Sequence, residues 1–160
     1  MLATEAMRSS FASIAPTAAL LDAIKLLLES GQCALPVIDD RGILVGAISD
    51  ADFLQFDEAE MSASSGSRSG QLFGAVERLT QRDGMLLVAI FMNSSPVVAN
   101  IDASFDEVIA HMDLYKVDQV LIVDAGSVLG VLSRREVLAV LERRWSSEVA
   151  TTSAELTAAK

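Results

Sequence analysis

The sequence is poor in cysteine, in aromatic residues and in long apolar runs. Its single cysteine, Cys33, excludes an intramolecular disulfide and a zinc site built from several cysteines. Aromatic residues make up 5% of the chain, so the core must consist mainly of Leu, Ile, Val and Ala. The longest apolar run is Met85–Met92, far short of the ~20 residues that a helix needs to cross a bilayer. We therefore expect no contact with a membrane.

Basic residues are also scarce. The chain has 12 Lys and Arg against 22 Asp and Glu, which gives a formal net charge of −10. Binding to nucleic acid needs clustered positive charge, so we expect no nucleic-acid partner. No basic segment followed by an apolar stretch opens the chain, which argues against a secretory signal and favours a cytoplasmic location. The 51% of hydrophobic residues among 160 predict a packed core, in one ordinary domain or two very small ones.

An internal repeat organises this chain. Its two copies lie 85 residues apart at first and 84 residues apart after a turn that is one residue shorter in the second copy. The matching segments are Met7–Ser10 with Met92–Ser95, Leu35–Asp39 with Val120–Asp124, and Val45–Ser49 with Leu129–Ser133. Each copy is too small to be stable alone, so we expect the two copies to bury their apolar faces against each other as a pseudo-two-fold pair.

Each copy predicts the order strand, helix, strand, strand, helix, and therefore an α+β fold. Helical spacing of apolar residues, a glycine stop at Gly31, turn residues at Asp39–Gly42 and a capping box formed by Ser104 and Glu107 support this order. The first copy's elements are expected at residues 12–15, 17–30, 35–38, 43–48 and 49–59. Those of the second copy are expected at residues 97–100, 104–115, 119–123, 127–132 and 134–145.

These elements divide the chain into four parts. Residues 1–59 form the first repeat and residues 90–145 the second. Residues 60–89 are expected to be a linker with helical segments, because a Ser- and Gly-rich stretch precedes two short apolar patterns. Residues 146–160 are small and polar, and we expect a flexible, frayed tail there.

The ordered motifs of both copies resemble the CBS (cystathionine-β-synthase) domain, and two copies joined by a linker resemble the tandem pair called a Bateman module. The resemblance rests on Leu35–Asp39, Val45–Asp52 and their counterparts in the second copy. It implies a stand-alone, non-catalytic regulatory module without an obligatory cofactor. Such a module would bind AMP, ADP, ATP or S-adenosylmethionine in clefts between the repeats and signal to an unknown regulated protein. The resemblance also implies a homodimer.

The resemblance further implies a set of ligand-binding residues. An acidic residue in the first turn of the last helix would accept hydrogen bonds from the ribose, serine and arginine would face phosphate, and the segment entering the first strand would flank the adenine. Carried over by position, the first copy offers Phe11, Ala12, Ser13, Ser49 and Asp52, and the second offers Pro96, Val97, Val98, Ser133, Arg134, Arg135 and Glu136. A helix N-terminus favours an anion, which suits this arrangement.

A structural explanation of the same residues stays open. Ser-x-x-Asp and Ser-x-x-Glu are also capping boxes, and the two arginines also suit a solvated surface or ion pairs. Phe11, Ile101 and Leu121 stand where the family favours proline, which suits an alternative function: a ligand-free structural or dimerisation module acting through protein–protein contacts. An enzyme is not expected, because no nucleophile–base pair and no glycine-rich phosphate loop is legible. No metal site is expected either, since His111 lacks partners of metal-binding type.

Overall fold

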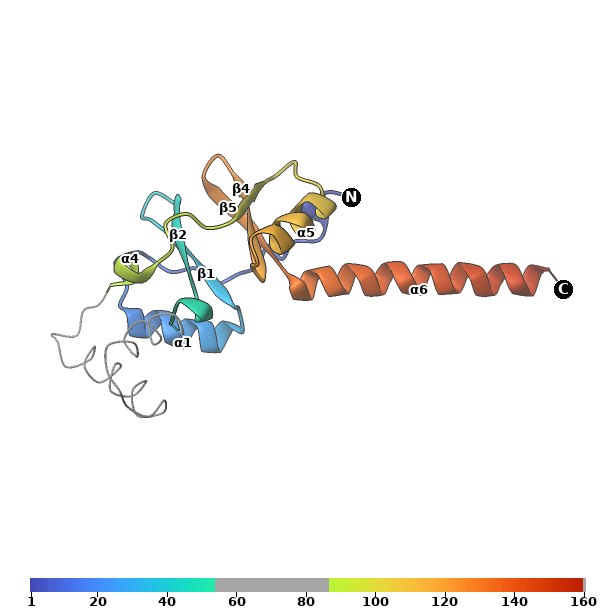
Figure 1. Cartoon of the computed structure of the whole chain (residues 1–160), viewed down its shortest axis with the longest axis horizontal. Coiled ribbons are helices and arrows are strands. Elements are labelled where there is room, and N and C mark those ends of the chain that lie inside the picture. Colours follow the sequence, from blue (N-terminus) through green and yellow to red (C-terminus); the bar gives the residue numbers. More distant parts are fainter. Residues whose placement is uncertain (54–86, 160) are drawn as a thin grey trace. The chain divides into compact units, whose positions relative to one another are not determined.

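The computed structural model describes residues 1–53 and 87–159, and it groups them into two compact units (Figure 1). The first-repeat unit consists of Phe11–Pro96 with Ala125–Val128, and the second-repeat unit of Met1–Ser10, Val97–Asp124 and Leu129–Lys160. These units differ from the sequence repeats in the opening segment of each copy and in Ala125–Val128, the second copy's hairpin turn, which belongs to the first-repeat unit. The segment that opens each copy, residues 1–10 or the residues up to Pro96, belongs to the unit that holds most of the other copy.

The first-repeat unit is built on a two-stranded sheet. Strand β1 (Ala34–Ile38) pairs antiparallel with β2 (Leu44–Ser49). Helix α1 (Leu20–Ser30) contacts β1, and the short helix α4 (Val88–Phe91) contacts β2 and α1. Apolar residues of all four elements, together with Ile14, form one buried cluster, which comprises Ile14, Leu20, Ala23, Leu27, Leu35, Val37, Ile48 and Val88. Both the predicted hairpin and the predicted stop of α1 at Gly31, whose φ is +67°, are confirmed.

The predicted strand at residues 12–15 is wrong in its extent. Only Ile14 pairs, in a single parallel bridge with Val37. The reason is the side-chain amide of the buried Gln32. It accepts a hydrogen bond from the Ala12 N–H at 2.6 Å and donates one to the Ala12 carbonyl oxygen at 3.2 Å. The backbone of Ala12 is therefore satisfied by a side chain rather than by a neighbouring strand.

The one-residue difference between the two hairpin turns has a local cause. In the first copy the Asp39 carboxylate accepts from the N–H groups of Arg41 and Ile43, and a positive φ occurs at Gly42. In the second copy Ala125 and Gly126 both have positive φ, as the mirror-image two-residue turns require. The shift of register between Val37 and Ile38 absorbs the extra residue of the first hairpin.

The second-repeat unit contains the remaining elements. These are a 3₁₀ turn η1 (Ala3–Glu5), β3 (Val98–Asn100), α5 (Phe105–Leu114), β4 (Gln119–Asp124), β5 (Ser127–Ser133) and α6 (Arg134–Ala158). The strands form one sheet in the order β3-β4-β5, with β3 parallel to β4. The core of this unit comprises Ala3, Ala99, Phe105, Val108, Val120, Ile122, Leu132 and Val140.

The capping box predicted at the start of α5 is confirmed. The Ser104 N–H donates to the Glu107 carboxylate at 2.7 Å, and the Glu107 N–H donates to the Ser104 hydroxyl at 3.2 Å. These bonds satisfy backbone donors that the first turn of a helix leaves without a partner. They also lower the pKa of Glu107, mainly because the Ser104 N–H stabilises the charged carboxylate.

The opening segment of each copy pairs with a strand of its unit next to a glycine. In the second-repeat unit, Arg8 exchanges two backbone hydrogen bonds with Val131, at 2.8 and 3.0 Å. In the first-repeat unit, Asn93 exchanges two with Ala47, at 2.8 and 2.9 Å. A glycine precedes each strand residue in these pairs: Gly130 precedes Val131, and Gly46 precedes Ala47. The sulfur of Met7 lies where a side chain at Gly130 would be, and the sulfur of Met92 lies where one at Gly46 would be.

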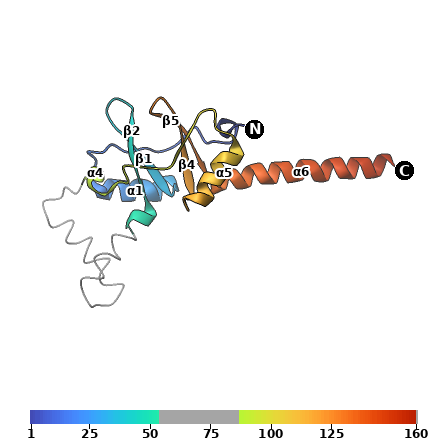
Figure 2. The same cartoon turned by 45° about the horizontal axis from the view of Figure 1, so that its top comes forward.

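The predicted end of the last helix near Trp145 and the predicted frayed tail after it are corrected. Helix α6 begins at Arg134 as predicted but continues to Ala158, and in Figures 1 and 2 its second half extends beyond the strands of its own unit. No glycine or proline interrupts residues 134–159. Hydroxyl groups in this half bond back to carbonyl oxygens four residues earlier, as Thr151 does to Ser147, so its polar side chains are compatible with the helix.

Parts of the predicted organisation fall outside the described residues. The linker expected at residues 60–89 is described only from Leu87 onward, where α4 agrees with the expected helical segment. The helix expected at residues 49–59 is described as helical from Asp50 to Phe53. Across residues 1–53 and 87–159, no helix combines the length and the apolar character that crossing a membrane requires.

Candidate ligand-binding site

Ser49 and Asp52 form a reciprocal cap at the helix that follows β2. The Ser49 N–H donates to the Asp52 carboxylate at 2.8 Å, and the Asp52 N–H donates to the Ser49 hydroxyl at 3.3 Å. Both side chains are half-buried. The structural explanation that we left open therefore holds for both residues. It is compatible with ligand binding, because a carboxylate accepts several hydrogen bonds at once.

Ser133 and Glu136 form the equivalent cap at the start of α6. The Ser133 N–H donates to Glu136 Oε2 at 2.9 Å, the Ser133 hydroxyl contacts the same oxygen, and the Arg135 N–H donates to Ser133 Oγ at 3.3 Å. The two repeats thus place a serine and a carboxylate in the same local geometry. Such a helix start presents N–H groups and partial positive charge to an approaching anion.

Arg8 is a site residue that sequence reasoning missed. Its Nε lies 3.9 Å from Glu136 Oε1, and the Glu136 side chain is only 12% exposed. Nε itself is buried and has no hydrogen-bond partner among the described residues. The backbone pairing with Val131 places Arg8 there, although Arg8 opens the first repeat. The only signal for Arg8 in the sequence is that it aligns with Asn93 in the second copy. That alignment does not predict that the Arg8 guanidinium lies beside α6.

The two arginines predicted to face phosphate have different surroundings. The Arg134 guanidinium makes an ion pair with the Asp118 carboxylate at 2.7 Å, and the Arg134 backbone N–H donates to the Asp118 carbonyl oxygen at 3.2 Å. Its guanidinium is therefore directed to the segment before β4. Arg135 is exposed and makes no ion pair with another described residue. Of the two, Arg135 is the cation that remains available to a ligand.

The segments predicted to flank the adenine precede the Ile14 bridge in the first copy and open β3 in the second. Phe11 and Ala12 are half-buried and Ser13 is exposed; Pro96 and Val97 are half-buried and Val98 is exposed. The first-repeat unit holds Phe11–Ser13 together with Ser49 and Asp52, and the second-repeat unit holds Val97 and Val98 together with residues 133–136. Pro96 is separated from its neighbours by this division, since it is the last residue of the first-repeat unit.

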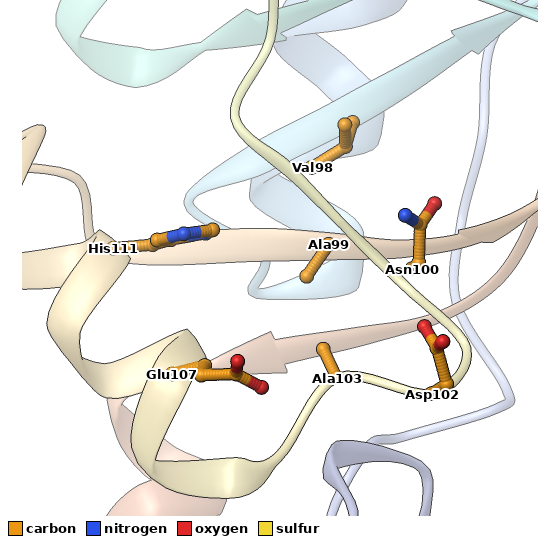
Figure 3. Close-up of a pocket in the computed structure, with 7 residues that line it drawn as sticks. All are labelled: Val98, Ala99, Asn100, Asp102, Ala103, Glu107 and His111. Carbon is orange, nitrogen blue, oxygen red and sulfur yellow. The ribbon is translucent and has the colours of Figure 1, made fainter.

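One cavity, of about 320 Å³, lies in the second-repeat unit between β3 and α5 (Figure 3). It is lined by Val98, Ala99, Asn100, Asp102, Ala103, Glu107 and His111. Glu107 and His111 extend from α5 toward β3, whereas Asn100 and Asp102 lie close together at the other end of the cavity (Figure 3). Of the predicted site residues only Val98 lines it. Its carboxylates disfavour a phosphate, so this cavity is not the predicted phosphate site.

His111 packs against a neighbouring aromatic ring. Its ring packs edge-on against Tyr115 with a centroid distance of 5.8 Å. Its Nδ1 is buried without a hydrogen-bond partner among the described residues. Within those residues no group of three or more His, Cys, Asp or Glu side chains has the arrangement that would hold a metal ion.

Comparison with known proteins identifies the family. The family model of the CBS domain matches residues 3–58 and 88–143. The chain therefore belongs to the CBS domain family and carries two copies of that domain. The α+β fold of two repeats that the sequence predicts is confirmed with it.

Individual relatives agree with this assignment. The curated protein "CBS domain-containing protein CBSX2, chloroplastic" from Arabidopsis thaliana is 27% identical over 139 residues, which cover 82% of this chain and 58% of that protein. The chain thus spans little more than half the length of this relative. A crystal structure of CBSX2 in complex with AMP has 27% identity and a TM-score of 0.64, and the match covers 86% of this chain and 92% of that one.

A more distant structure shares the fold. The CBS domain pair of the protein MJ0100 was solved in complex with 5′-methylthioadenosine and S-adenosyl-L-methionine. It has 19% identity and a TM-score of 0.64, and the match covers 90% of this chain and 98% of that chain. Solved members of this fold thus include complexes with adenosine compounds. The matched regions of this chain are CBS domains, which are generally regulatory and non-catalytic.

Proposed function

We propose that this chain is a regulatory module that binds an adenosine-type ligand, AMP, ADP, ATP or S-adenosylmethionine, in the clefts between its repeats. The observation that carries the proposal is the duplicated serine–carboxylate cap at the helix after β2 and at the start of α6. The AMP complex of the relative CBSX2 supports the ligand class. Ligand-induced change in the pair would be transmitted to a regulated protein, and a cytoplasmic homodimer is part of the same proposal.

In the proposed binding mode each residue has a distinct task. Asp52 and Glu136 accept hydrogen bonds from the ribose, and Ser49 and Ser133 hold those carboxylates in place. Arg135 contacts phosphate, while Arg8 neutralises Glu136 and adds positive charge to the second site. Phe11, Ala12, Ser13, Pro96, Val97 and Val98 flank the adenine. Because the chain carries a net charge of −10, local cations are needed to hold an anionic ligand.

Asp52→Ala tests the ribose role of the first repeat. A ligand at 100 times its dissociation constant stabilises a protein by ~2.7 kcal/mol, which for a chain of this size corresponds to roughly 5–10 °C in Tm. We expect one adenosine compound to raise Tm by this amount in the wild type, and the increase to shrink in Asp52→Ala. Loss of the cap alone costs only ~1 kcal/mol, so the variant stays folded.

The matched control is Asp50→Ala, which removes an exposed carboxylate two residues away. It should keep the full response to ligand. Titration calorimetry with AMP, ADP, ATP and S-adenosylmethionine, each with and without Mg²⁺, identifies the ligand and the number of sites. Equal affinities in wild type and Asp52→Ala would refute the ribose role. No binding at millimolar concentrations would favour the ligand-free dimerisation module.

A further inference from the structure

Helix α6 carries an exposed apolar stripe along its whole length. Its residues follow one another at spacings of three, four, four and seven, which keep them on one face of a straight helix. The members are Leu138, Leu141, Trp145, Val149 and Leu156, with exposed fractions of 65, 45, 73, 57 and 68%. Thr152 completes the spacing between the last two. Core contact is made by a different face, where Val140 is buried.

The second half of α6 has no packing to stabilise it within one chain. Every residue from Leu141 to Ala159 is exposed. A helix of about 12–15 residues is marginal in water unless an apolar face is buried, and serine and threonine lower its propensity further. A helical segment 146–158 is thus best explained by burial of its stripe against a partner.

The stripe begins at a mainly apolar cavity of about 440 Å³ between α5 and α6. Its apolar lining comprises Ile109, Met112, Val117, Val137 and Leu138. Two cations, Lys116 and Arg134, and one carboxylate, Asp113, line the same cavity. Both cations already form exposed ion pairs, with Asp113 and Asp118, but such pairs contribute little and are readily shared with another carboxylate.

We propose that α6 of a second copy of this chain covers the stripe in an antiparallel orientation. Leu138 then lies opposite Leu156 of the second copy, Leu141 opposite its Thr152, and Trp145 opposite its Val149. The arrangement is isologous, as a two-fold dimer requires. Along the helix pair, Leu138 of one copy then lies about 27 Å from Leu138 of the other. Leu156 of each copy reaches the apolar cavity of the other.

Charge complementarity selects the second copy as the occupant. Glu155 precedes Leu156, so its carboxylate reaches the second copy's cavity, where Lys116 and Arg134 lie. In the same register Arg144 of one copy lies beside Glu148 of the other on the same flank of the stripe. Within its own chain, the Arg144 guanidinium lies over the Phe105 ring at 5.6 Å. Opposite charges therefore meet on both sides of the two-fold axis.

The double variant Trp145→Glu and Val149→Glu tests the interface at its centre. Sedimentation equilibrium should give twice 17.0 kDa for the full chain and a monomer for the variant, with self-association at least ~100-fold weaker because two buried side chains become charged. The control Ala139→Glu and Ala150→Glu adds the same charge about 100° round α6 from the stripe and should remain a dimer. A monomeric wild type, or a variant that stays dimeric, would overturn the proposal.

Cross-linking tests the orientation. In a Cys33→Ala background, chains carrying Leu138→Cys are mixed with chains carrying Leu156→Cys and oxidised. The antiparallel pair predicts a disulfide between the two kinds of chain and none between two Leu138→Cys chains. Disulfides between identical positions would indicate a parallel pair and refute the geometry. Circular dichroism should also show that the helix content of the chain falls on dilution below the dissociation constant, as unfolding of residues 146–158 requires.

This inference deepens the homodimer of the proposed function, and the two fail separately. A nucleotide response that persists in the monomeric variant leaves ligand binding intact. A dimer that forms through α6 but shows no nucleotide response leaves the interface intact and refutes the ligand.

Discussion

At the scale of single residues, two glycines make room for a chain segment that crosses a strand closely. A Cβ at Gly46 would lie 2.8 Å from the Asn93 carbonyl oxygen and 2.7 Å from the Met92 sulfur. A Cβ at Gly130 would lie 2.5 Å from the Met7 sulfur and 3.0 Å from the Arg8 carbonyl oxygen. Both glycines let the opening segment of a copy approach a strand closely enough to exchange two backbone hydrogen bonds with it.

Gly46→Ala should destabilise the protein by ~1–3 kcal/mol, the usual cost of overpacking, in urea unfolding. Two further variants distinguish a clash with a side chain from a clash with the backbone. Met7→Ala should relieve most of the cost of Gly130→Ala, because the closest atoms there belong to the flexible Met7 side chain. Met92→Ala should relieve little of the cost of Gly46→Ala, because the Asn93 carbonyl remains. Full rescue at both positions would show that backbone approach is unimportant.

The residue scale also explains why part of the candidate site escaped prediction. Ser49, Asp52, Ser133 and Glu136 were recognised because a cap depends on neighbours in the sequence. Arg8 was not, because its position beside Glu136 depends on a strand far along the chain. A local pattern identifies the carboxylates of a site but not the distant cation that neutralises one of them.

At the scale of elements, caps define where helices begin. The Ser104–Glu107 box opens α5, and Ser104→Ala should lower stability by ~1 kcal/mol. This box also makes stability depend on pH. The folded pKa of Glu107 lies below its ordinary value, mainly because the Ser104 N–H bonds the carboxylate. Its contribution is therefore present above the unfolded pKa and is lost as the pH falls through the folded value.

Glu107→Gln should make the protein less sensitive to acid than the wild type, when Tm is followed from about pH 7 down to about pH 3. The control is Asp106→Asn, which removes an exposed carboxylate in the same turn without removing the cap. Parallel Tm profiles for wild type and Glu107→Gln would contradict the role of this cap in the pH dependence.

Two elements show where local rules fail. The stretch at residues 12–15 has the apolar pattern of a strand, but the Gln32 amide takes both backbone groups of Ala12. The tail after Trp145 has the composition of a frayed end, yet it is helical to Ala158. In both cases the deciding partner is remote in sequence or, as we propose for α6, on another chain.

At the scale of the whole molecule, the two compact units and the two repeats do not coincide. Ala3 is fully buried in the second-repeat unit, its N–H donates to the Ala103 carbonyl oxygen at 2.9 Å, and Phe105 bonds back to Met1. The opening residues therefore stabilise the body of the other copy. Each unit depends on a segment that lies far from most of its sequence.

Deletion of residues 1–10 should consequently weaken the second-repeat unit more than the first. Hydrogen exchange should show faster exchange in α5 and β5, and little change in β1 and β2, although these strands are nearer in sequence. The matched control replaces residues 2–10 with a Gly/Ser sequence of equal length, which keeps the chain length but removes the contacts. It should behave as the deletion does. Faster hydrogen exchange confined to the first-repeat unit would refute the assignment of residues 1–10 to the second-repeat unit.

The sequence by itself determined the duplicated order of elements, the helix caps, the turn residues and the family, because each depends on spacing within a few residues or on repetition along the chain. Tertiary structure alone decided that the opening segments change units, that Gln32 replaces a strand partner, that Arg8 faces Glu136, and that Arg134 turns to Asp118. These contacts join residues far apart in sequence. Their hydrogen bonds and ion pairs need partners that only the tertiary fold brings together, and no local pattern encodes those partners.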